Sequence, residues 1–162
     1  MSLAIRPAAP GDRAAIWAIL EPVLRAGETY ALNRDLTREA ALAYWLGADR
    51  IPFVAEAAGE IVGTYYLRAN QAGGGAHVAN CGYATHPEAR GRGIARAMAE
   101  HSFAEARARG FRAMQFNFVV SSNAAAVRLW HALGFETVGR IPEAFEHPAL
   151  GLVDALVLYR RL

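Results

Sequence analysis

The chain has 162 residues, which fits one domain with a continuous core and is too short for two domains of ordinary size. Hydrophobic residues make up 54% of the sequence and charged residues 20%, so the chain is expected to fold rather than stay disordered. The formal net charge is only +2, which argues against a densely basic surface and so against a nucleic-acid partner.

The residue types also argue against disulfide, metal and membrane chemistry. Cys81 is the only cysteine, so it forms no internal disulfide, supplies no metal cage, and is expected to fill a buried strand position. Residues 1–13 carry charges and no apolar core of signal-peptide length, and no later segment approaches a membrane-spanning run. We therefore expect a cytoplasmic protein without a metal or a membrane partner.

The start of the chain predicts a strand followed by two helices. A short strand fits residues 4–6. Asp12 stands where it can cap a helix running to about Arg25, and Thr37 stands where it can cap a second helix over 38–46. Both helices precede the main run of strands.

Three strands are predicted next. Residues 51–56 and 61–70 are apolar, β-branched and aromatic, and residues 57–60 between them have the Ala-Ala-Gly-Glu composition of a hairpin turn. A glycine-rich loop at 71–75 then leads to a strand over 77–85. No helix separates these three strands.

The pattern then changes to the period of a helix. From residue 94 to residue 109 small and apolar side chains share one face, at Ala95, Met98, Ser102 and Ala106. Gly110 can end this helix in a left-handed cap. A strand over 111–120 follows, with Gln115 and Asn117 on one face and the other face formed by Met114, Phe116, Phe118 and Val120.

The last residues predict a helix and two strands. The helix, over 124–133, has three candidate caps, Ser121, Ser122 and Asn123. The strands fit 136–140 and 152–159, so residues 144–151 are expected to connect them and to cover a binding site or meet a partner subunit. The resulting order is βααβββαβαββ, an α/β fold with a mixed sheet.

The segment Arg90-Gly91-Arg92-Gly93 lies between a predicted strand and a predicted helix. Glycines let backbone N–H groups turn toward an anion, and a helix N-terminus adds a favourable field. Nearby arginines, including Arg96, add charge-assisted contacts. The segment therefore predicts a phosphate site, although a glycine pair before a helix also fits an ordinary tight turn.

Two motifs resemble those of the GCN5-related N-acetyltransferase (GNAT) superfamily. Its acetyl-CoA loop, Gln/Arg-x-x-Gly-x-Gly/Ala, is matched by Arg90, Gly93 and Ala95. Its fourth strand and turn resemble residues 82–87, and its closing motif resembles residues 123–135, Asn-x-x-Ala-x-x-Leu-Trp-x-x-Leu-Gly-Phe. Because the element order is also shared, the resemblance covers nearly the whole chain.

The resemblance implies one GNAT-like α/β domain over residues 1–162, with a mixed, mostly antiparallel sheet flanked by helices. It also implies acetyl-CoA as co-substrate, lying in a V between the strands that end near Thr85 and Val119. The residues implied to hold acetyl-CoA are Tyr83, Ala84 and Thr85 along the pantetheine arm, Arg90, Gly91, Arg92, Gly93, Ile94 and Ala95 at the pyrophosphate, and Asn123.

A narrower resemblance concerns the acceptor. Asn80, Asn117 and Asn123 match the spacing of an asparagine trio in yeast acetyltransferases of toxic proline analogues, and phosphinothricin-type and methionine-sulfone-type enzymes form a neighbouring group. It implies that Asn80 and the backbone around Asn117 bind the carboxylate of an amino acid or a toxic analogue. The alternative is that both are ordinary buried amides satisfied by neighbouring strands.

Direct attack in a ternary complex needs a proton acceptor but no covalent enzyme intermediate. Asparagine is not basic, so the candidate acceptors are Glu28, His86, Glu143 and His147. Glu28 lies between the first two helices, where the resemblance places the acceptor pocket, so we expect it to contact the acceptor and act as a base through water. A solvated loop carboxylate is the alternative. Asn123 and Glu28 are thus the catalytic candidates.

The proton donor is not identified. Many family members have a tyrosine where this chain has Trp130, and indole is a poor acid, so Trp130 is expected to pack against the sheet or shape the acyl pocket. The thiolate proton is left to water, to the amine, or to Ser121 or Ser122. Four other aromatic residues fit core and pocket walls equally well: Tyr30, Tyr44, Trp45 and Tyr65.

Two other functions stay open. The enzyme could acetylate a protein N-terminus or a lysine, which requires an open acceptor groove. Alternatively, the chain could be a non-catalytic acyl-CoA-binding sensor, because it has Trp130 where many family members have the tyrosine that protonates the thiolate. The expected partner is a small-molecule amine, and homodimer formation is left open. The chain has no lysine, so it cannot acetylate its own lysine side chains.

Overall fold

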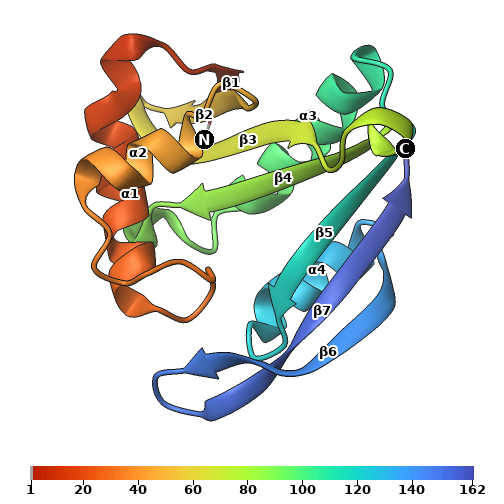
Figure 1. Cartoon of the computed structure of the whole chain (residues 1–162). Coiled ribbons are helices and arrows are strands. Elements are labelled where there is room, and N and C mark those ends of the chain that lie inside the picture. Colours follow the sequence, from red (N-terminus) through yellow and green to blue (C-terminus); the bar gives the residue numbers. More distant parts are fainter. Residues whose placement is uncertain (1) are drawn as a thin grey trace.

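A computed structural model describes residues 2–162, and its elements follow the predicted order (Figure 1). The helices are α1 (Arg13–Ala26), α2 (Arg38–Trp45), α3 (Ile94–Ala108) and α4 (Ala124–Ala132). The strands are β1 (Leu3–Pro7), β2 (Ile51–Ala57), β3 (Glu60–Ala69), β4 (Val78–Thr85), β5 (Ala113–Val120), β6 (Glu136–His147) and β7 (Gly151–Arg161). The predicted α/β fold with a mostly antiparallel sheet is confirmed.

The sheet has the strand order β1-β2-β3-β4-β5-β7-β6, and its central pair is the exception to its antiparallel pattern. Strands β4 and β5 run parallel and pair only at Val78 with Ala113 and at Ala79 with Met114. Beyond these pairs the two strands diverge, so the sheet forks into a V (Figure 1).

Helices cover both faces of the sheet and define two cores. On one face α1 and α2 bury a cluster that includes Ile16, Leu42 and Trp45. On the other face α3 and α4 bury a second cluster that includes Met98 and Trp130. Each such side chain stabilises the fold by about 1.5–3 kcal/mol through removal of apolar surface from water. The cluster on the α3–α4 face contains residues of both arms of the V, including Tyr65 of β3 and Leu158 of β7.

The predicted caps differ in outcome. Thr37 caps α2, because its side-chain oxygen accepts the N–H of Ala40 at 3.1 Å. Asp12 is the N-cap residue of α1, as predicted, but its side chain makes no capping hydrogen bond to that helix. A 3-10 turn over Pro10–Asp12 precedes the helix, and Asp12 closes that turn by accepting the N–H of Ala9 at 2.7 Å. The guanidinium of Arg6, 2.8 Å away, lowers the pKa of the Asp12 carboxyl.

Side chains along β5 were predicted to alternate between the two faces of the sheet, and this alternation is interrupted by a β-bulge. Phe116 pairs with Leu158 but Val119 pairs with Leu156, so β5 carries one extra residue there. Phe118 therefore leaves the face of Phe116 and lies against Phe145, with ring centroids 6.3 Å apart. The bulge interrupts the β5–β7 pairing on one arm of the V.

The last two strands are longer than predicted. Strand β6 continues through Phe145 to His147, and β7 begins at Gly151, so residues 144–151 are not the separate covering loop that was expected. The pairing is irregular between Ile141 and Phe145 and then resumes, which extends the hairpin beyond the rest of the sheet (Figure 1). No helix within residues 2–162 is long and apolar enough to cross a membrane.

Candidate active site

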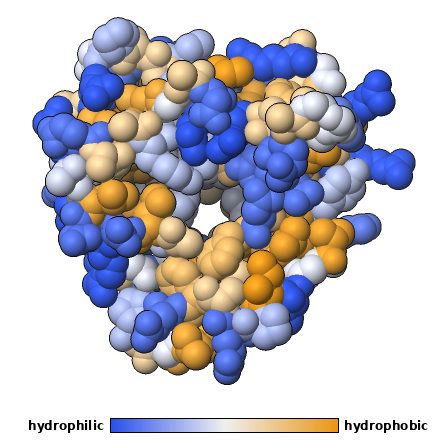
Figure 2. All heavy atoms as spheres, in the orientation of Figure 1, coloured by the Kyte–Doolittle hydropathy of each residue, from blue (hydrophilic) through white to orange (hydrophobic). Residues whose placement is uncertain are grey.

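A cleft of about 630 Å³ occupies the fork between β4 and β5 and reaches both faces of the sheet. In the space-filling view it appears as an opening near the centre of the molecule (Figure 2). Its α1–α2 end is formed by Glu28, Tyr30, Tyr44 and Tyr66, among others. Its α3–α4 end is formed by residues that include Arg90, Ala95, Asn123 and Ala126.

The edge of β4 presents backbone groups to this cleft. The N–H of Asn70 donates to the carbonyl of Val78, and the N–H of His86 donates to the carbonyl of Val62, each at 2.8 Å. In an antiparallel ladder the bonded residues alternate, so the even-numbered residues of β4 bond to β3. The backbone groups of Tyr83 and Thr85 consequently face the side from which β5 has diverged. Those of Ala84 face β3, and Ala84 lines the cleft with its side chain.

The predicted phosphate loop leads into α3. Gly91 and Gly93 both have φ of 77°, a left-handed conformation that glycine adopts readily. The first bond of the helix runs from the N–H of Ala97 to the carbonyl of Gly93, at 3.0 Å, so the preceding amides have no partner inside the helix. Arg90 and Arg92 are exposed beside them. This end of the cleft is suited to an anion.

Ile94 belongs to the same motif but has a different role in the fold. Its side chain is 2% exposed and packs in the core of the α3–α4 face. It therefore anchors the start of α3, and only its backbone N–H is available to a ligand. Ala95, one residue further, lines the cleft.

Asn123 begins α4 and also lines the cleft. Its side-chain oxygen accepts the N–H of Ala126 at 3.4 Å, so Asn123 provides the helix cap for which Ser121 and Ser122 were the other candidates. Neither serine lines the cleft. Within the described residues, the side-chain N–H groups of Asn123 donate no hydrogen bond and are available to a ligand.

Asn80 and Asn117 line the cleft, but the fold uses their side chains. The Asn80 amide donates to the carbonyl of Gln115 at 2.8 Å, just beyond the last β4–β5 pair. The Asn117 amide donates to the side chain of Asn70 at 2.6 Å and accepts from the side chain of Gln115 at 2.9 Å. The contact of Asn80, which is partly buried, matches the alternative interpretation of an amide satisfied by a neighbouring strand, whereas Asn117 is exposed and bonds to Gln115 of its own strand and to Asn70.

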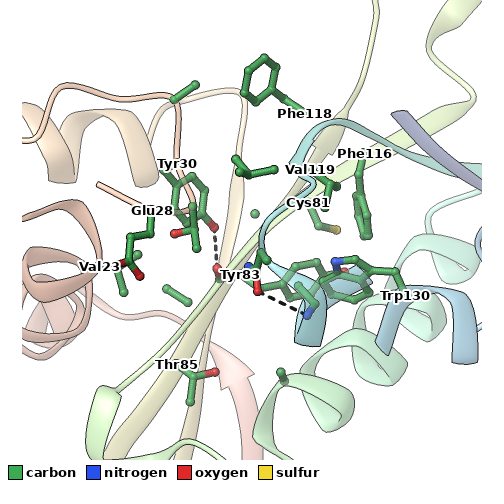
Figure 3. Close-up of a pocket in the computed structure, with 18 of the residues that line it drawn as sticks. Val23, Glu28, Tyr30, Cys81, Tyr83, Thr85, Phe116, Phe118, Val119 and Trp130 are labelled. Atoms are coloured by element: carbon green, nitrogen blue, oxygen red, sulfur yellow. Dashed lines mark hydrogen bonds between the residues drawn. The ribbon is translucent and has the colours of Figure 1, made fainter. Parts of the chain in front are cut away.

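Of the four candidate proton acceptors, Glu28 alone lines the cleft. It is exposed on the loop that follows α1, beside Tyr30 (Figure 3). His86 instead accepts the N–H of Glu88 at 3.2 Å, and Glu143 and His147 belong to the β6–β7 hairpin. The loop after α1 thus brings a single carboxylate to the cleft.

Aromatic side chains form the wall on the α3–α4 side. The ring of Trp130 lies 4.7 Å from that of Phe116 and 5.1 Å from that of Tyr83, between centroids, and Trp130 is 8% exposed (Figure 3). It packs against the sheet, as predicted. Cys81 lies nearby, and burial raises the pKa of its thiol to about 12, so it stays protonated and unreactive at neutral pH.

Tyr30 is a cleft residue that the sequence did not distinguish from core aromatics. Its hydroxyl donates to the backbone carbonyl of Tyr83, one of the β4 residues whose backbone faces the cleft (Figure 3). Tyr44 also lines the cleft, whereas Trp45 and Tyr65 are at most 1% exposed in the cores. No local pattern separates Tyr30 from these core residues, because its position depends on how the loop after α1 folds against β4.

Comparisons with known proteins agree on one family. A sequence model of the acetyltransferase (GNAT) family matches residues 14–135. The N-acetyltransferase aca1 of Schizosaccharomyces pombe is 33% identical over 84 residues, which cover 52% of this chain and only 40% of that relative. The chain thus matches less than half the length of this curated relative.

Solved structures match over almost the whole chain. A GCN5-related N-acetyltransferase from Kribbella flavida has a TM-score of 0.93 and 41% identity, covering 99% of this chain and 98% of that one. YncA of Salmonella typhimurium, a putative acetyltransferase solved with its cofactor acetyl-CoA, has a TM-score of 0.86 and 24% identity, covering 100% and 95%. The second likeness concerns the fold alone.

Proposed function

This chain belongs to the acetyltransferase (GNAT) family, and from that premise we propose that its cleft transfers the acetyl group of acetyl-CoA to the amine of a small molecule. The observation that carries the proposal is the continuity of the cleft. It runs from the unpaired amides at the start of α3, along the free backbone edge of β4, to a carboxylate on the loop after α1.

The α3–α4 end fits the pyrophosphate and pantetheine of acetyl-CoA. The N–H groups from Gly91 to Ala95 and the helix field would bind the pyrophosphate, with Arg90 and Arg92 adding charge. The backbone groups of Tyr83 and Thr85 suit the amides of the pantetheine arm. Their spacing along an open strand edge supports an extended ligand rather than a compact one.

The chemistry proceeds by direct attack. The neutral amine attacks the thioester carbonyl carbon, the new N–C bond forms as the C–S bond breaks, and the proton lost by the amine ends on the CoA sulfur. A free N–H on the β4 edge would stabilise the oxyanion. Glu28 would accept the amine proton through water, and Asn123 would hold the acetyl or pantetheine portion. Trp130 supplies no proton, so we assign no general acid.

The acceptor predicted from the sequence is an amino acid or a toxic analogue. Backbone groups at the bulge around Asn117 support that prediction, since Asn117 and Phe118 have no paired residue on β7. The amide contacts of Asn80 and Asn117 count against it. Two functions compete with this proposal: acetylation of a peptide N-terminus or lysine, and a sensor role without turnover. Substrate assays distinguish these functions from acetylation of a small amine.

The proposed activity is tested by release of free CoA thiol from acetyl-CoA with purified protein. The acceptor panel should hold proline analogues, phosphinothricin, methionine sulfone, common amino acids, simple amines and N-terminal peptides. Turnover with small amines is the expected result. Turnover with peptides alone would favour the macromolecular acceptor, and measurable acetyl-CoA binding with no turnover on any acceptor would favour the sensor.

Replacing Asn80 by alanine is expected to weaken acetyl-CoA binding and acceptor use together. The Asn80→Ala change removes the hydrogen bond that joins β4 to the carbonyl of Gln115 on β5. Its loss should lower the free energy of unfolding by about 1–2 kcal/mol and let the two strands that form the cleft shift relative to each other. Urea unfolding, the Kd for acetyl-CoA and kcat/KM for the amine measure the three effects. Loss of acceptor use alone would instead show that Asn80 contacts the acceptor, as the sequence predicted.

A further inference from the structure

The α1–α2 end of the cleft, where the acceptor would enter, is mainly aromatic. Tyr30, Tyr44 and Tyr66 line it, with Phe118 on the opposing arm of the V. Tyr66 lies edge-on to Tyr44, at 6.3 Å between ring centroids. Burial raises the pKa of the Tyr30 and Tyr66 hydroxyls, so both are neutral at physiological pH. A ligand at this end meets ring surfaces and neutral hydroxyls.

The charge at this end is negative. Among all the described residues that line the cleft, only Glu28 and Arg90 are charged, and Arg90 lies at the start of α3, at the α3–α4 end. Helix α1 ends at Ala26, two residues before Glu28, and Val23 of its last turn also lines the cleft. Two arginines offset the partial negative charge of this helix end, Arg25 in the last turn and Arg34 on the Arg25 carbonyl, so the negative charge at this end of the cleft rests on Glu28.

The arginines closest in sequence and space to this end are bound elsewhere. The Arg50 guanidinium packs on the rings of Tyr44 and Tyr66, bonds to Asp49 at 3.1 Å, and does not line the cleft. Arg68 is also paired with Asp49, at 3.0 Å. Arg25 donates to the carbonyl of Leu36 in the loop after α1, and Arg34 donates to the carbonyl of Arg25 in the last turn of α1. The α1–α2 end therefore offers no cationic side chain to a carboxylate.

From these features, and resting on the proposed transfer of acetyl to a small amine, we infer that the acceptor is a primary amine without a carboxylate, carried on an aromatic or apolar body. Its ammonium form would be attracted by Glu28, before the amine loses a proton and attacks, while its apolar body packs against the tyrosine rings. A free amino acid would bring its carboxylate toward Glu28, with the side chains of Asn80 and Asn117 already bonded.

Matched pairs of compounds test this inference. Phenethylamine and phenylalanine differ only in the carboxylate, as do tyramine and tyrosine, and 3-methylthiopropylamine and methionine. Binding of each to the protein–CoA complex by calorimetry needs no turnover, and kcat/KM for CoA release adds the kinetic comparison. We expect the amine to be favoured over its amino acid by about 10-fold or more in both measurements. Equal or better binding of the amino acids would overturn the inference.

Variants identify the source of the preference. Glu28→Gln keeps the shape of the side chain and removes its charge, so it should reduce the preference for phenethylamine over phenylalanine to within about 3-fold. Glu60→Gln makes the same change at the β2–β3 turn, outside the cleft lining, and should leave the preference intact. An undiminished preference in Glu28→Gln would refute the role of that carboxylate.

The same measurements separate this inference from the proposed function. If no amine releases CoA although acetyl-CoA binds, the proposed transfer is wrong. The inference about the acceptor is still decided by the dissociation constants of phenethylamine and phenylalanine. Tighter binding of phenethylamine by about 10-fold supports it, and equal or tighter binding of phenylalanine overturns it.

Discussion

Replacing Gly93 by glutamate is expected to raise the Kd for acetyl-CoA by about 100-fold or more, equivalent to about 2.7 kcal/mol. Gly93 is the N-cap of α3 with φ of 77°, and a side chain in this left-handed conformation costs about 1–2 kcal/mol. The added carboxylate would also sit at the helix N-terminus and compete there with the pyrophosphate for the free amides. Titration calorimetry with acetyl-CoA measures the change.

A matched variant separates the local strain from the lost anion site. Gly59, in the turn between β2 and β3, has φ of 81° and open space around the position of an added Cβ, as Gly93 does. Gly59→Glu therefore introduces the same residue with the same strain away from the cleft, and should leave the Kd for acetyl-CoA within about 2-fold of the parent. If Gly93→Glu binds acetyl-CoA as the parent does, the phosphate loop is wrongly assigned.

The order of elements could be predicted because each depends on local pattern. The period of small residues from Ala95 to Ala106 fixes α3, and the turn at Ala58 and Gly59, both with positive φ, fixes the β2–β3 hairpin. The glycine turn before α3 could be predicted for a similar reason, since its residues are contiguous and their geometry depends on glycine, and its role as a phosphate loop stays a prediction.

The features that escaped prediction depend on residues far apart in the chain. The bulge in β5 and the continuation of β6 to His147 are set by register against β7, which no local pattern encodes. The bonds of Asn80 to Gln115 and of Tyr30 to Tyr83 join segments 35 and 53 residues apart. The acceptor end of the cleft is assembled from such contacts, so its chemistry could be inferred only from the structure.

The second large effect is expected at Gly82, where β4 passes beneath the ring of Tyr66. A Cβ added to Gly82 would lie 2.5 Å from Cε2 and 2.8 Å from Cζ of that ring. The ring has little freedom to retreat, because Trp45 packs on it at 4.9 Å and Arg50 at 4.8 Å. Overpacking of this kind lowers the free energy of unfolding by about 1–3 kcal/mol, and we expect Gly82→Ala to fall in the upper part of that range.

The same clash should reach the acceptor end of the cleft, because Tyr66 lines it. We expect Gly82→Ala to lower kcat/KM for the amine by about 100-fold, since small misplacements of binding groups are amplified in the rate. The Kd for acetyl-CoA should change far less, because the phosphate loop lies at the other end of the cleft. Steady-state kinetics and calorimetry on the folded variant distinguish the two.

Two further variants test whether the loss of stability in Gly82→Ala comes from the clash with the Tyr66 ring. Gly139→Ala, also within a strand, places its Cβ 3.6 Å from Val157, an ordinary contact, and should change stability by no more than about 0.5 kcal/mol. In Gly82→Ala/Tyr66→Leu the smaller side chain leaves room for the new methyl group. The two substitutions should therefore destabilise the protein by about 1–2 kcal/mol less together than the sum of their separate effects. Strict additivity would mean that Gly82 is required for a reason other than the approach of Tyr66.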